Sequence, residues 1–115
     1  MAENLRIKRT SEAPARGDGK RILVDRLWPR GKTKESLKLD LWLRDIAPST
    51  QLRQWFGHDP AKWAEFRKRY FAELKKNPAV ATLREWMAKG TVTLVFAASD
   101  TEHCNAVALR EYLQR

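Results

Sequence analysis

The sequence predicts an α/β fold: a single small layered domain over residues 1–115, in which a short, mostly parallel sheet is flanked by about four to five helices. Two segments carry this prediction. Within residues 21–25 and 91–97, the stretches 22–24 and 94–97 are apolar on successive positions, which is typical of strands that are covered on both faces and are therefore parallel. Helical patterns fill most of the chain between them. A chain of 115 residues has the usual size of one domain.

The first part of the chain predicts one edge strand and one buried strand. Apolar and basic residues alternate over Leu5–Arg9, as suits an edge strand. Residues 16–20 contain two glycines and an aspartate and predict a loop. The run Arg21–Asp25 predicts the first buried strand, which ends before Trp28–Gly31 because proline cannot continue a ladder. Residues 36–47 fit both a strand and a helix, and periodicity does not decide between them.

Two helices are predicted in the middle of the chain. Ser49 caps a short helix over Thr50–Phe56, which a glycine ends. Asp59 followed by proline is the start signal of a second, longer helix. Its apolar residues recur at helical spacing, so we expect them to form one stripe that faces the core. They are Trp63, Phe66, Tyr70 and Leu74.

The last part of the chain predicts a helix, a strand and a final helix. Residues 77–90 carry the start and stop signals of a third helix. Residues 91–97 form the second buried strand, the strongest strand pattern in the chain. Ser99 and Glu102 match a capping box, which predicts a last helix over Asp100–Gln114.

Composition excludes several classes of protein. With 43% hydrophobic and 32% charged residues, the chain is too apolar to be disordered and too charged for a membrane protein. Residues 1–20 lack the apolar core of a signal peptide, so we expect a cytoplasmic protein without membrane contact. A single cysteine, Cys104, excludes an internal disulfide and a zinc site built on cysteine pairs. The two histidines, His58 and His103, show no metal-ligand spacing, so we expect no metal and no cofactor.

The net charge of +9 is unevenly distributed. Residues 1–38 hold eleven basic and five acidic groups, and residues 59–76 hold six and three. Basic domains attract polyanions through counterion release, so we expect weak, sequence-independent binding of nucleic acid or of phosphate ligands. The alternative interpretation is a solvated surface without a partner. The cations expected to bind are the arginines of residues 6–30 together with Lys62, Arg67, Lys68 and Arg69.

Parallel sheets bind ligands beyond the carboxyl ends of their strands. Residues 25–31 follow the first buried strand, and residues 98–103 follow the last. If these strands are neighbours, both segments face one crevice. His58, between the two middle helices, is a further candidate. The candidate ligand-binding residues are Asp25, Arg26, Trp28, Arg30, His58, Ser99, Asp100 and His103.

Most of these candidates have a purely structural alternative. A half-buried Asp25 needs a donor, and Arg26 or Arg30 either pairs with it or stays free to grip an anion. Trp28 either stacks on a base or a partner, or covers the core. For Ser99 and Asp100 the alternative is simple capping of a helix. For His58 the alternative is a structural place in the turn between two helices. Cys104 is better explained as a packed small residue than as a nucleophile, because nothing in its sequence context lowers its pKa.

The string RILVDRLWPRG over residues 21–31 resembles the opening motif of the YeaO-like family, bacterial proteins grouped under domain of unknown function 488. The segments 41–49, 52–58 and 94–100 agree with the same family, so the resemblance runs over nearly the whole chain. It implies a compact cytosolic α/β domain whose activity is not established. Longer relatives carry a Cys-His-Arg motif after the last strand. Here the corresponding stretch is Glu102–Asn105, in which that order is absent.

Two functions remain open, and the sequence does not decide whether the protein is an enzyme. In the first, the crevice binds an anionic ligand, a nucleotide or a nucleic-acid phosphate. In the second, the protein is a non-catalytic interaction or structural module, in which Asp25 pairs internally with an arginine and Trp28 or the Lys62–Arg69 surface docks a partner. Crevice arginines without a carboxylate partner favour the first function, whereas fully paired arginines favour the second.

Overall fold

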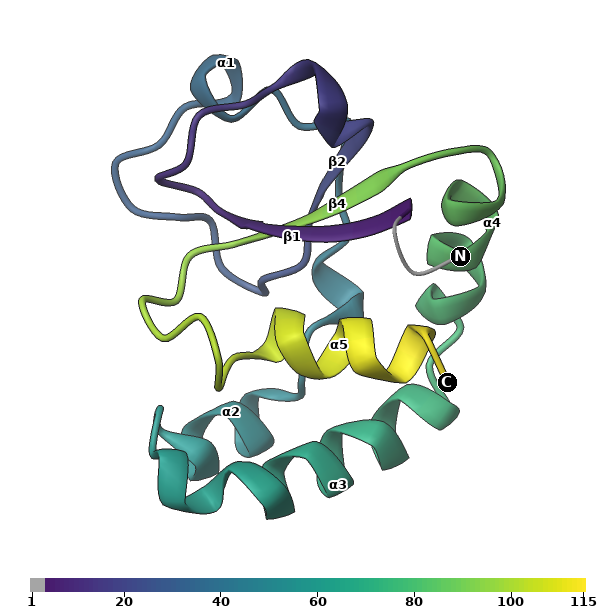
Figure 1. Ribbon diagram of the computed structural model, residues 1–115. Coiled ribbons are helices and arrows are strands. Elements are labelled where there is room, and N and C mark those ends of the chain that lie inside the picture. Colours follow the sequence, from purple (N-terminus) through teal and green to yellow (C-terminus); the bar gives the residue numbers. More distant parts are fainter. Residues whose placement is uncertain (1–3) are drawn as a thin grey trace.

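A four-stranded parallel sheet lies at the centre of the computed structural model, which describes residues 4–115. The strand order is β1-β4-β2-β3, and each neighbouring pair is parallel (Figure 1). The predicted edge strand and the two predicted interior parallel strands are confirmed. The strands are β1 (Leu5–Arg9), β2 (Lys20–Leu23), β3 (Leu41–Trp42) and β4 (Val92–Phe96).

Within the described part of the chain, five helices connect and cover these strands. The ambiguous segment 36–47 contains the end of the first short helix, the two-residue strand β3 and a 3-10 turn, so it is neither one helix nor one strand. No helix among residues 4–115 is long and apolar enough to cross a membrane. The helices are α1 (Lys34–Leu37), α2 (Thr50–Phe56), α3 (Trp63–Lys75), α4 (Ala79–Ala88) and α5 (Asn105–Leu113), with 3-10 turns at Arg16–Asp18, Arg44–Ile46 and Pro60–Lys62.

The capping signals predicted for α2 are confirmed. Ser49 Oγ accepts a hydrogen bond from the Leu52 amide at 3.1 Å, and Gly57 ends the helix with φ of 54°, in the left-handed region that favours glycine. The amide and the hydroxyl of Ser49 both donate to the carboxylate of Glu73 on α3, at 2.9 and 2.6 Å. This second contact fixes the start of α2 against α3, and so fixes where the side chains of α2 point.

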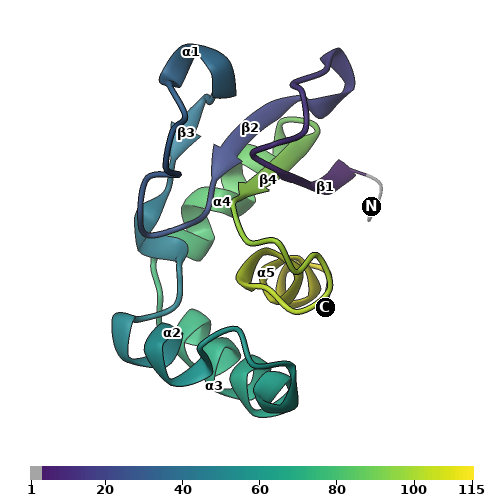
Figure 2. The same ribbon diagram turned by 90° about the vertical axis from the view of Figure 1, so that its left-hand side faces the viewer.

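Helices α2, α3 and α5 lie in layers on one face of the sheet (Figure 2). Figure 2 shows α5 between the sheet and the pair α2 and α3, and α5 contacts both β1 and β4. The predicted stripe of α3 is confirmed, because Phe66, Tyr70 and Leu74 are buried and Trp63 is half-buried. The Tyr70 hydroxyl donates to the Ile46 carbonyl at 2.6 Å, which ties the 3-10 turn before α2 to this layer.

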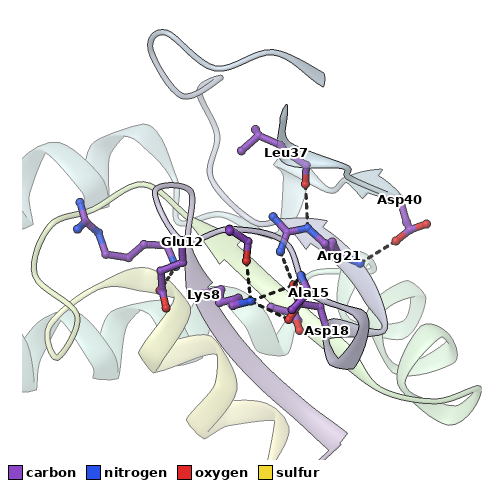
Figure 3. Close-up of polar contacts among 10 residues, drawn as sticks. Lys8, Glu12, Ala15, Asp18, Arg21, Leu37 and Asp40 are labelled. Atoms are coloured by element: carbon purple, nitrogen blue, oxygen red, sulfur yellow. Dashed lines mark hydrogen bonds and ion pairs between the residues drawn. The ribbon is translucent and has the colours of Figure 1, made fainter. Parts of the chain in front are cut away.

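A buried polar cluster lies on the opposite face of the sheet (Figure 3). Asp18 and Arg21 are each only 3% exposed, and Arg21 Nη1 lies 2.7 Å from Asp18 Oδ2. Lys8 Nζ lies 2.9 Å from the other carboxylate oxygen, and Arg21 Nε donates to the Leu37 carbonyl at 2.8 Å. Burial alone raises the pKa of Asp18, but the Ala15 amide and the two cations outweigh it and lower the pKa below its ordinary value. The cluster fastens the predicted loop 16–20 and α1 to the sheet.

The last helix begins later than the capping box predicts. It starts at Asn105, so the prediction of a helix from Asp100 is wrong. Asp100 Oδ1 accepts hydrogen bonds from the amides of Glu102 and His103, at 2.9 and 3.0 Å. This local turn satisfies the same donors that a helix start would use, and it therefore competes with the helix. The exposed side chain of Ser99 caps nothing within residues 4–115.

Candidate functional site

A cavity of about 320 Å³ lies at the carboxyl ends of β2 and β4. Asp25 reaches it from just after β2, and Ala97 and Ala98 reach it from just after β4. Helix α2 and the start of α5 close its remaining sides. This is where open parallel sheets bind ligands, and the volume lies at the small end of the range for ligand pockets.

Five of the eight sequence-predicted candidates line this cavity: Asp25, Arg26, Trp28, Arg30 and His58.

The other three candidates, Ser99, Asp100 and His103, are not among the residues that line the cavity. His103 Nδ1 lies 3.0 Å from Asp100 Oδ2, and its ring packs edge-on against Trp63 with 5.5 Å between the ring centres. The expectation that residues 98–103 as a whole face the crevice is therefore wrong, because the turn at Asp100 directs most of that segment elsewhere.

Asp25 joins three structural elements at the edge of the cavity. Its Oδ2 accepts from the Ala97 amide at 2.9 Å, and its Oδ1 accepts from Asn105 Nδ2 at 3.1 Å. Asn105 also donates to the Val24 carbonyl at 3.2 Å, so the ends of β2, β4 and α5 are linked. Burial raises the pKa of Asp25, and the two amide donors together with the nearby His58 oppose that rise.

The interpretation in which Asp25 pairs with an arginine is wrong. Arg26 donates instead to backbone carbonyls, from Nη2 to Ala47 at 3.2 Å and from Nε to Pro48 at 3.3 Å. The side chains of Arg30 and Arg53 are exposed and make no ion pair or hydrogen bond to any other described residue. All three arginines line the cavity, and within residues 4–115 none of their guanidinium groups has a carboxylate partner.

Apolar and aromatic side chains form much of the cavity wall. Phe56 of α2 stacks on Phe66 of α3 with 4.3 Å between ring centres, and both rings line the cavity. Trp28 lies against Trp42 edge-on at 5.3 Å, and its Nε1 donates to the Lys32 carbonyl at 2.8 Å. Trp28 is thus held by its own loop and by β3, with part of its surface left to the cavity.

Cys104 also lines the cavity, but it has the properties of a packed residue. It is 2% exposed, and burial raises the pKa of its thiol despite hydrogen bonds from the amides of Val107 and Ala106. A thiol in this state is protonated at neutral pH and is a poor nucleophile. Within residues 4–115 no three His, Cys, Asp or Glu side chains gather as a metal site would require.

The cationic surface expected on α3 and the turn before it is largely used for internal contacts. Lys62 Nζ donates to the Trp55 carbonyl at 2.9 Å, Arg67 pairs with Glu111, and Arg69 pairs with Glu65 at 2.9 Å. Arg69 also stacks over the Trp55 ring at 4.1 Å. Of the four cations named for this surface, only Lys68 makes no such contact within the described part of the chain.

A family model described as the inactive DUF488-N3 subclade matches residues 4–115. The uncharacterized protein YeaO of Escherichia coli (strain K12) is 39% identical over 112 residues, which cover 96% of this chain and 97% of that protein. The uncharacterized protein Rv3073c of Mycobacterium tuberculosis (strain H37Rv) is 38% identical over 109 residues, which cover 95% of this chain and 92% of that protein. No solved structure matches the chain significantly.

Proposed function

The chain belongs to the YeaO-like DUF488 family, in the subclade described as inactive. We propose that it is a non-catalytic module that binds a small anionic ligand. The binding site is the cavity at the carboxyl ends of β2 and β4. The relatives are themselves uncharacterised, so the proposal rests on the chemistry of the cavity.

One observation carries the proposal: three arginines border one cavity and none has a carboxylate partner within residues 4–115. Guanidinium groups match the oxygens of phosphate and carboxylate groups and bind them through paired hydrogen bonds. Arg26 is already oriented by the carbonyls of Ala47 and Pro48, while Arg30 and Arg53 keep all of their donors available. The nearest carboxylate that lines the cavity, Asp25, is bound to amides instead.

A binding role without catalysis fits the residues at the start of α5. The stretch Glu102–Asn105 lacks the Cys-His-Arg order, and the buried thiol of Cys104 has a raised pKa. A small ligand also fits better than a nucleic-acid chain. The cavity is small, and Lys62, Arg67 and Arg69 are engaged within the protein.

We expect Arg30→Ala and Arg53→Ala to leave the free protein nearly as stable as the wild type, within about 0.5 kcal/mol, because both side chains are exposed. Inorganic phosphate and ribose 5-phosphate should stabilise the wild type through mass action, by about 2.7 kcal/mol at a hundredfold excess over Kd. Each variant should need a higher ligand concentration for the same gain, and the double variant should show no gain. Thermal unfolding at constant ionic strength measures both effects.

Arg16→Ala is the matched control, because Arg16 is also exposed, makes no side-chain hydrogen bond or ion pair within residues 4–115 and does not line the cavity. It should retain the full gain. The proposal is wrong if neither these two anions nor a nucleoside monophosphate stabilises the wild type, or if the double variant gains as much as Arg16→Ala.

A further inference from the structure

The cavity contains a group that an anion alone would not need. Asp25 lines it, and a carboxylate beside a bound anion repels that anion unless something lies between them. An ionised carboxylate offers about four acceptor positions, and the Ala97 amide and Asn105 Nδ2 occupy two of them. The remaining acceptor capacity belongs to a cavity-lining side chain. A ligand therefore gains most if it presents a hydrogen-bond donor to Asp25 and its negative charge to the arginines.

The arginines and the carboxylate that line the cavity differ in how far they are buried. Arg30 and Arg53 are exposed, whereas Asp25 is half-buried and linked to the interior through Asn105. The ligand's anion therefore lies near the mouth of the cavity and its donor lies deeper.

The walls between these groups suit a flat, apolar ring. Phe56 and Phe66 form a stacked pair, and Trp28 and Pro48 line the same cavity. An apolar and aromatic lining of this kind favours a ligand with a heterocyclic ring over a fully polar ligand. A volume of about 320 Å³ limits the ligand to one aromatic ring system, a small linking group and one charged group, and it excludes a dinucleotide.

We infer that the ligand is a nucleoside 5′-monophosphate whose base carries an amino group, with the phosphate on Arg30 and Arg53 and the amino group donated to Asp25. This inference rests on the proposed function and assigns Asp25 as the residue that determines specificity. Carboxylates accept from exocyclic amino groups of bases in the same way when proteins recognise cytosine.

Three matched pairs of nucleotides test the inference on the wild-type protein. They are AMP with purine riboside 5′-monophosphate, CMP with its 4-desamino analogue, and GMP with IMP. The members of each pair differ in the amino group, and GMP and IMP share the same ring N–H. We expect at least one amino-bearing nucleotide to bind tenfold or more tightly than its partner in calorimetric titration, because a carboxylate left without its donor is costly.

Asp25→Asn is the corresponding variant, and it should reduce that preference to near one. Ribose 5-phosphate has no base to donate to Asp25, so it should bind this variant at least as tightly as the wild type, because a repelling charge is removed. Asp45→Asn is the control, because Asp45 is exposed and does not line the cavity, and it should keep the preference. If Asp25→Asn does not fold, the three pairs on the wild type still decide.

The outcomes separate the inference from the proposed function. Equal affinity within every pair, or ribose 5-phosphate binding as tightly as the nucleotides, overturns the inference and leaves the proposed function intact. If no phosphate compound binds at all, the proposed function falls and the inference falls with it.

Discussion

Asp18→Asn should lower the free energy of unfolding by on the order of 3–5 kcal/mol, because it removes one partner of a buried ion pair. Arg21 Nη1 lies 2.7 Å from Asp18 Oδ2, and Arg21 is only 3% exposed. Water therefore cannot replace the carboxylate as the partner of the guanidinium group. Its Nη2 already has no hydrogen-bond partner, so the lost carboxylate contact leaves only the Leu37 carbonyl. Urea denaturation at neutral pH measures the loss.

Two comparisons make this prediction specific. Asp45→Asn removes the same charge at an exposed position and should change stability by less than about 0.5 kcal/mol. Arg21→Met should cost much less in the Asp18→Asn background than in the wild type, because the two side chains depend on each other. Equal costs in both backgrounds would show that the pair is not coupled.

The dependence of stability on acid pH provides a second readout. The folded-state pKa of Asp18 is lowered, so the ionised carboxylate stabilises the fold above its unfolded pKa of about 4. That contribution should be lost as the pH falls through the lower folded-state pKa. Wild-type stability should thus decline below about pH 4, and more steeply than the stability of Asp18→Asn.

Gly19→Ala should be comparably destabilising, by about 3–5 kcal/mol, because strain and collision add together. Gly19 has φ of 64° and ψ of −136°, a backbone conformation that residues with a side chain rarely adopt. An added Cβ would also overlap the Thr91 carbonyl oxygen and lie 2.8 Å from the Thr91 carbonyl carbon. Relief is difficult because the same oxygen accepts from the Lys20 amide where β2 meets β4. Thermal unfolding measures the change.

Gly31→Ala separates the two causes. Gly31 also has positive φ, 77°, but nothing lies within 4 Å of its added Cβ. It should cost only the backbone strain, about 1–2 kcal/mol. If Gly19→Ala costs no more than Gly31→Ala, the close approach of Gly19 to Thr91 contributes nothing to stability.

Much of the fold is predictable because its signals are local. The parallel interior strands follow from the apolar runs at 21–25 and 91–97, and α2 follows from Ser49 and Gly57. The prediction of where α5 starts is wrong for a reason that is also local. Asp100 satisfies the amides of Glu102 and His103 in a turn, and a capping box in the sequence does not show which carboxylate takes those donors.

Most of the correctly predicted site residues follow β2, and His58, in the turn after α2, is the exception. Asp25, Arg26 and Arg30 come directly after β2, so the rule for parallel sheets finds them. Arg53 and Phe56 reach the cavity because α2 packs against α3, and no periodicity in the sequence reports that contact. The loop predicted at residues 16–20 does not reveal that Asp18 is buried, since its partners Lys8 and Arg21 approach it only in the folded sheet.

The most direct test of the anion-binding cavity is a titration of ¹⁵N-labelled protein with inorganic phosphate and with AMP, followed by heteronuclear NMR at constant ionic strength. Bound anion should produce saturable shifts at the backbone amides of residues 25–28, of Arg30 and of Ala97, and at the side-chain Nε–H groups of Arg30 and Arg53. Shifts that do not saturate and spread over exposed cations such as Lys68 and Arg16, with the cavity signals unchanged, would contradict the account.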